Sequence, residues 1–197
     1  SWRDWMGRIG VPWGGSSART HTLANLLAEL DAMGFAQAAV LGMAIGLPFG
    51  DHLTETWMDA IEQSPARDRF VPFASVHPRD SRCVEKLRAF AARGARGVKL
   101  HPEMQRFAPD DPQAMQIYAE CELLGLPVIF HAGRSGIEPE SIRPYALIRH
   151  YVPAIRACHR VQFVLGHAGA RDVEDAVLAA RQYANVWLEI ACQGATQ

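Results

Sequence analysis

The chain has 197 residues, of which 49% are hydrophobic and 21% charged, and its 20 basic and 21 acidic side chains leave a formal net charge of -1. This composition predicts one globular domain, 1–197, with a substantial core. It argues against nucleic acid or a membrane as a partner, because no block of like charge stands out and no apolar run reaches the roughly 18 residues of a membrane span.

Two local features indicate where the chain resides. The amino-terminal stretch SWRDWMGRIGVPWGG has no apolar segment between a basic start and a cleavage site, so no signal peptide is expected. The four cysteines form no C-x-x-C pair, which predicts reduced, mostly buried thiols and a cytoplasmic location. They are Cys83, Cys121, Cys158 and Cys192.

Six short runs rich in Val, Ile, Leu and Phe alternate with helical patterns at a period of about 30 residues, the size of one βα unit. The runs are continuous rather than alternating, which is typical of parallel strands covered on both faces. The predicted strands are Gln37–Leu41, Phe70–Val76, Gly97–His101, Pro127–His131, Val161–His167 and Val186–Ile190.

Capping residues predict where the intervening helices begin and end. Three helices are framed by an N-terminal signal and a glycine: Thr22 to Gly34, Ser81 to Gly94, and Asp111 to Gly125. Two more are expected at Leu53–Gln63 and Arg171–Tyr183. Pro144 and Pro153 predict that the helical segment 138–159 is broken.

Strand–helix units in one direction fit a (β/α)8 TIM barrel or an open doubly wound sheet. No G-x-G-x-x-G or Walker loop follows any strand, so the nucleotide-binding open sheets lack support. Because a barrel usually takes ~250 residues, we expect an α/β TIM barrel that lacks one strand at each end. The open sheet edge that this leaves makes a homodimer plausible.

Four predicted strands exit into histidine, at His77, His101, His131 and His167. The carboxyl ends of parallel strands share one face, where active sites are built. Imidazoles that converge there can bind a divalent metal or shuttle protons.

His131 and His167 form the sharpest pair, since each opens an identical His-Ala-Gly step at the same point of its unit. Glycine there allows a tight turn and leaves room for a ligand. The alternative is that each histidine merely hydrogen-bonds its own loop.

Lys99 is one of only two lysines in the chain, and strand alternation places it on the same face as His101. A buried lysine can act as an acid or base or be carbamylated to bridge metals. The alternative is a structural ion pair with Glu189, at the equivalent height of a later strand.

Two further residues are candidates for binding substrate. His101 precedes a proline, which forces an extended strand exit, so it either contacts substrate or caps the loop. Arg134 follows the first His-Ala-Gly step and would clamp a carboxylate in a bidentate manner, unless it is simply a solvated surface arginine. Trp2, Trp5 and Trp13 form an aromatic arm that either covers the barrel mouth or packs on a partner.

Several segments taken together resemble the amidohydrolase-related TIM-barrel metal-dependent hydrolases, a family that includes aminocarboxymuconate semialdehyde decarboxylase. The segments are ARGVKLHP (95–102), DDP (110–112), LGLPVIFHAG (124–133), VQFVLGHAG (161–169) and ANVWLEI (184–190). Their order and spacing carry the resemblance from about residue 23 to residue 190.

The resemblance implies that His131 is the metal ligand that ends strand five. It implies that His167, ending strand six, binds a second metal or positions the reactive water. Lys99 occupies the position of a lysine that bridges two metals in some relatives. The family's His-x-His motif is not found in this sequence, nor is its strand-eight aspartate.

The expected function is therefore a metal-dependent hydrolase of a small-molecule substrate, with zinc the favoured divalent metal. His131 and His167 are the expected metal ligands, His167 and Lys99 the catalytic groups, and His101 and Arg134 the substrate contacts. Two alternatives remain: a metal-dependent non-oxidative decarboxylase of an aromatic or unsaturated acid, and a non-catalytic, metal-free barrel.

Overall fold

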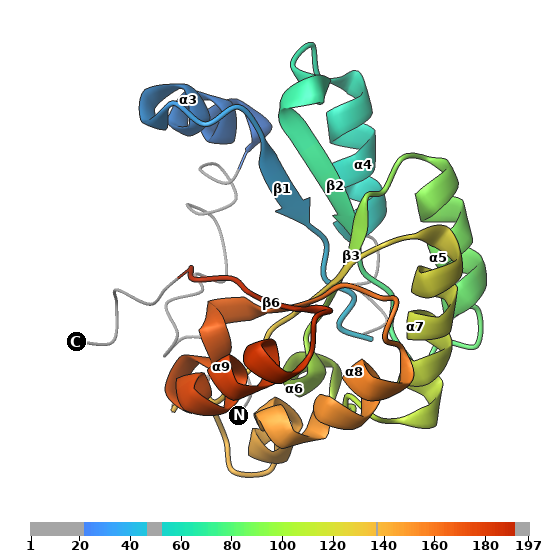
Figure 1. The fold of residues 1–197 in the computed structure, drawn as a ribbon. Coiled ribbons are helices and arrows are strands. Elements are labelled where there is room, and N and C mark those ends of the chain that lie inside the picture. Colours follow the sequence, from blue (N-terminus) through green and yellow to red (C-terminus); the bar gives the residue numbers. More distant parts are fainter. Residues whose placement is uncertain (1–21, 47–52, 137, 192–197) are drawn as a thin grey trace.

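The computed structural model describes residues 22–46, 53–136 and 138–191, which form one curved parallel sheet with helices around its outer side (Figure 1). Six strands lie in the order β1-β2-β3-β4-β5-β6, and every neighbouring pair is parallel. This is the arrangement of a TIM barrel, with six strands among the residues described. The strands are β1 (Ala38–Leu41), β2 (Phe70–Ala74), β3 (Gly97–Leu100), β4 (Val128–Phe130), β5 (Phe163–Leu165) and β6 (Val186–Leu188).

The helices lie between the strands, as the repeat predicts. They are α3 (Leu23–Met33), α4 (Leu53–Gln63), α5 (Cys83–Ala92), α6 (Pro102–Gln105), α7 (Pro112–Leu124), α8 (Val152–Ala157) and α9 (Val173–Gln182). The segment between β4 and β5 is broken as expected, since two short 3-10 turns, Arg143–Ala146 and Ile148–His150, precede α8.

Caps explain both ends of α3 and α7. The Thr22 side chain accepts a hydrogen bond from Asn25 N at 3.2 Å and the Asp111 side chain one from Gln113 N at 2.8 Å. Gly34 and Gly125 end α3 and α7 in the left-handed conformation. Side chains that satisfy the free N–H groups of a first turn stabilise a helix by ~1 kcal/mol.

The predicted bounds of two helices and of all six strands differ from those observed. Helix α5 begins at Cys83 rather than Ser81, because Asp80 rather than Ser81 accepts the hydrogen bond from Arg82 N, at 2.9 Å, and also pairs with Lys86. Helix α9 is shorter at both ends than predicted. All six strands stop short of their predicted ends or begin later, so the exit histidines lie in the loops that follow them.

The two faces of the sheet differ in burial. The face covered by helices carries Val98, Leu100, Val128, Phe130, Phe163 and Leu165, which are all fully buried. Full burial of one such side chain contributes about 1.5–3 kcal/mol. On the other face, one row of register-paired residues, Lys99, Ile129, Val164 and Trp187, remains partly or largely exposed.

Three free cysteines are buried, as expected: Cys83, Cys121 and Cys158. Cys192 lies outside the described residues, as do Trp2, Trp5 and Trp13 of the proposed aromatic arm. Within the described part of the chain, no helix is long and apolar enough to cross a membrane.

Candidate metal and active site at the strand exits

The loops after β3, β4 and β5 bring three imidazoles together. The ring of His131 stacks on that of His101, with ring centroids 3.9 Å apart and an interplanar angle of 10°. On its other side, Nδ1 of His131 lies 3.1 Å from Nε2 of His167. The predicted meeting of His131 and His167 is thus observed, and His101 joins them.

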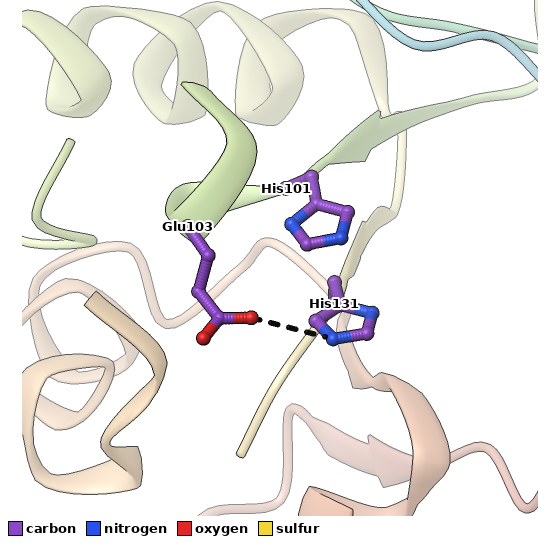
Figure 2. Close-up of side chains that lie close together, drawn as sticks. All are labelled: His101, Glu103 and His131. Atoms are coloured by element: carbon purple, nitrogen blue, oxygen red, sulfur yellow. Dashed lines mark ion pairs between the residues drawn. The ribbon is translucent and has the colours of Figure 1, made fainter. Parts of the chain in front are cut away.

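Glu103 is the fourth member of this cluster, and the sequence analysis missed it. It sits on α6, a single turn for which His101 is the N-cap and Pro102 the first residue. Its side chain is only 1% exposed, and Oε2 lies 3.5 Å from Nε2 of His131 (Figure 2). The other oxygen, Oε1, is buried and has no hydrogen-bond partner among the residues that the structure describes.

Gln105 holds this turn in place. Its Oε1 accepts a hydrogen bond from His101 N at 2.8 Å, and its Nε2 donates to the carbonyls of Ala44 and Val76. The buried amide of Gln105 thus joins the segments after β1 and β2 to the start of α6. These hydrogen bonds fix the position of α6 and therefore of Glu103.

Burial keeps these side chains uncharged near pH 7. Desolvation, together with the charges of Lys99 and His167, lowers the pKa of His131 to about 3. Burial also holds the pKa of His101 well below its usual value. Desolvation, reinforced by the Glu138 carboxylate, raises the pKa of Glu103 to about 8. The two imidazoles therefore keep free lone pairs, as a metal ligand must.

The backbone sets the orientation of the His167 ring. Nδ1 of His167 lies 3.0 Å from the Ala191 carbonyl, which can only accept a hydrogen bond, so Nδ1 carries a proton. Nε2 of His167 lies 3.1 Å from Nδ1 of His131 and, in the tautomer in which it carries no proton, accepts a hydrogen bond from that Nδ1. Nε2 of His131 consequently directs its lone pair toward Glu103.

The two His-Ala-Gly loops touch each other. A Cβ placed on Gly133 would lie 1.7 Å from the Gly169 carbonyl oxygen, so only glycine fits there. In the second loop, four consecutive residues, His167 to Ala170, have positive φ, three of them not glycine. Such backbone strain is found mainly where a functional arrangement requires it.

Lys99 projects from β3 on the less covered face of the sheet. Burial lowers the pKa of its ammonium to about 8, opposed by the Glu189 carboxylate. Among the described residues the two form no ion pair; Glu189 Oε2 instead accepts a hydrogen bond from His167 N at 3.2 Å. The interpretation of Lys99 as one half of a Glu189 ion pair is therefore wrong for this structure.

Arg134 is engaged by the protein itself. Its Nε and Nη2 both contact the carboxylate of Asp172, at 2.8 and 2.5 Å from Oδ1, and Asp172 is almost fully buried. Arg134 is thus neither free to clamp a substrate with these nitrogens nor simply solvated, and its substrate role remains a prediction.

The family model described as amidohydrolase matches residues 17–196, and the chain therefore belongs to that family. No curated protein matches the chain.

Solved structures share the fold at low identity. An uncharacterised TIM-barrel protein from Bordetella bronchiseptica superposes with a TM-score of 0.71 at 21% identity, over 95% of this chain and 65% of that one. A probable 2-pyrone-4,6-dicarboxylic acid hydrolase from Acinetobacter baumannii gives 0.58 at 18%, over 87% and 60%. The 2,6-dihydroxybenzoate decarboxylase from Rhizobium gives 0.57 at 18%, over 84% and 63%. The chain spans less than two thirds of each of these proteins.

Proposed function

We propose that this chain carries part of the active site of a metal-dependent hydrolase that opens an amide, ester or lactone carbonyl. The observation that carries the proposal is the contact between His131 and His167 at neighbouring strand exits, 3.1 Å apart, in a chain of the amidohydrolase family. Neutral imidazoles and an unpartnered buried carboxylate oxygen on Glu103 suit a bound cation.

His131 is the residue that would hold the metal, with its neighbours in the cluster supplying the remaining donors. A zinc ion in such a site lowers the pKa of bound water and polarises a carbonyl. The protein residues act around that centre. Nε2 is the nitrogen of His167 that can accept a proton, because Nδ1 donates to the Ala191 carbonyl, and it does so once the hydrogen bond from Nδ1 of His131 has opened.

Lys99, on β3, is a second group near the strand exits that can carry a proton. Its pKa of about 8 makes the ammonium a readier acid than an ordinary lysine, and it lies close enough to His131 to affect that ring's pKa. In this proposal Lys99 protonates the leaving group while His167 deprotonates the attacking water.

The alternative, non-oxidative decarboxylation, has one observation in its favour. Lys99 offers a partly buried cation that can hold a carboxylate, and Glu103, whose pKa is about 8, is a neutral acid that can supply a proton to carbon. The similarity in fold to the 2,6-dihydroxybenzoate decarboxylase supports this alternative no more than the similarity to the pyrone hydrolase supports the first.

The test uses the 197-residue chain loaded with zinc and two sets of assays. Lactone, ester and amide hydrolysis is followed by acid release, and aromatic-acid decarboxylation by carbon dioxide release. We expect hydrolysis in the wild type and a loss of about 100-fold or more in kcat for His167→Asn. His159→Asn, an exposed histidine on another surface, is the control. Carbon dioxide release without hydrolysis would favour the alternative, and hydrolysis unaffected by His167→Asn would contradict the proposed role of His167.

A further inference from the structure

We propose that His101, Glu103 and His131 bind one divalent transition-metal ion, in a site built entirely from the loops after β3 and β4. This site uses neither His167 nor a His-x-His motif. It rests on the metal that the proposed function places at His131, but it needs no substrate and no turnover, so a failure of catalysis would leave it intact.

The chain places these three donors side by side through local structure. His101 and His131 follow neighbouring parallel strands, and the backbone N–H of His131 still donates to the Leu100 carbonyl at 2.9 Å, which keeps the two exits in register. Glu103 lies two residues beyond His101 on the single turn of α6 and points back toward His131 (Figure 2).

Their ligand atoms lie within 4.8 Å of one another, and Glu103 Oε2 lies 3.5 Å from Nε2 of His131. Ligands of one zinc ion, each at about 2.0–2.2 Å from the metal, are separated by about 3–4 Å. The three donors therefore need only small movements to share an ion.

Glu103 gives the independent sign that a ligand is expected here. Its carboxyl group is 1% exposed, and Oε1 has no hydrogen-bond partner. Buried polar atoms of folded proteins are nearly always satisfied, because an unsatisfied one destabilises the fold. A cation between Glu103 and the imidazoles would satisfy the carboxylate directly.

One ring must turn for the site to close. Two stacked, parallel imidazoles cannot both direct their in-plane lone pairs at one ion. His131 is held by the contacts to His167 and Glu103, whereas the side chain of His101 has only a long hydrogen bond of 3.4 Å from Met104 N to its Nδ1. We therefore assign the rotation to His101, about its Cβ–Cγ bond.

The donor chemistry selects the metal. Two imidazoles and one carboxylate are a set that zinc uses with an open fourth position, and both histidines are partly exposed to solvent. Calcium and magnesium prefer oxygen ligands throughout. Zinc and cobalt are therefore the expected occupants.

The experiment titrates zinc into the metal-free 197-residue chain and follows binding by calorimetry. Cobalt absorption bands, which report nitrogen ligands and a low coordination number, provide a second readout. We expect one ion per chain. Glu103→Gln, which is nearly isosteric, and His101→Asn should each weaken binding by about 10-fold or more. Circular dichroism checks that each variant is folded.

Two controls make the result decisive. Glu85→Gln removes an exposed carboxylate from α5 and should leave the affinity unchanged. His167→Asn should also retain the metal. The proposal is overturned if the wild type binds no zinc, if Glu103→Gln binds as tightly as the wild type, or if His167→Asn alone abolishes binding. Zinc binding without any hydrolase activity would contradict the proposed function and leave this site intact.

Discussion

Two loops of this protein share the tripeptide His-Ala-Gly yet differ in backbone and surroundings. In the His-Ala-Gly step after β4, only the glycine, Gly133, has a positive φ, of 79°. In the loop after β5, His167, Ala168 and Gly169 all do, with φ of 56°, 45° and 80°. The same three residues at equivalent points of adjacent units therefore take two conformations.

The surroundings account for the difference. The first loop is held by ordinary hydrogen bonds, from Gly133 N to the Ala146 carbonyl and from the Tyr151 hydroxyl to the His131 carbonyl. In the second loop, His167 N donates a hydrogen bond to the side chain of Glu189, and Ala168 N donates one to the backbone carbonyl of Glu189. Identical residues thus serve two purposes: the first loop holds His131 against His101 and Glu103, and the second turns His167 toward His131.

The largest effect is expected where the two loops touch. Gly133→Ala places a Cβ against the Gly169 backbone, which no side-chain movement can relieve, and should lower the free energy of unfolding by at least about 3 kcal/mol. The matched control is Gly34→Ala. Gly34 has a similar φ of 72°, and a Cβ added there meets no described atom within 4 Å. This substitution should lower the free energy of unfolding by about 1 kcal/mol. Urea denaturation measures both, and equal losses would contradict the close approach.

The next effect uses the burial of His131. Its pKa of about 3 in the folded protein lies below the usual 6.5, so below pH 6.5 the unfolded chain takes up a proton that the folded protein does not. Stability attributable to this residue is present above pH 6.5 and is lost as the pH falls from there toward 3. We compare the free energy of unfolding at pH 7 and pH 5, with a chelator present. The free energy of unfolding of the metal-free wild type should fall by about 2 kcal/mol more than that of His131→Asn.

His159→Asn is the control for that comparison, because it removes an exposed histidine. If the wild type and His131→Asn showed the same pH dependence, His131 would not be buried as the structure has it.

A third pair of variants compares the backbone strain of the two His-Ala-Gly loops directly. Glycine tolerates a positive φ, so Ala168→Gly relieves strain while losing a methyl group, whereas Ala132→Gly loses a fully buried methyl group without any such relief. Ala132→Gly should therefore be the more destabilising by about 1–2 kcal/mol. Equal effects in thermal denaturation would show that the second loop is not strained.

The smallest effect concerns the support of the first loop. Tyr151→Phe removes the hydrogen bond to the His131 carbonyl, and Tyr118→Phe removes one of the same length, 2.9 Å, to the Pro109 carbonyl far from the site. Each should reduce the free energy of unfolding by about 1 kcal/mol. Only Tyr151→Phe should also weaken zinc binding, and a loss of affinity in both would indicate a general effect of stability.

Much of the fold follows from local signals in the sequence. Continuous apolar runs located all six strands, and Thr22, Asp111, Gly34 and Gly125 marked helix ends because their effects act within one turn of the helix. The start of α5 was misplaced because two neighbouring polar residues, Asp80 and Ser81, compete for the same role. Asp80 takes it through its hydrogen bond from Arg82 N and its ion pair with Lys86 on the second turn of the helix.

The site was predictable only where topology determined it. Parallel strands bring their exits together, which is why the contact of His131 with His167 could be expected. Glu103 could not be found in this way, since a glutamate after His-Pro resembles a solvated first-turn residue until the buried Gln105 fixes the turn. The ion pair of Arg134 could not be found in this way either, because its partner Asp172 lies on the next loop of the barrel.

The most direct test of the account is a crystal structure of the zinc-soaked 197-residue chain with anomalous diffraction at the zinc edge. The account predicts one anomalous peak at about 2.0–2.2 Å from a ring nitrogen of His131, with His101 and Glu103 as the other protein ligands and the ring of His101 turned out of the stack. A peak elsewhere, or none at a saturating zinc concentration, would contradict it.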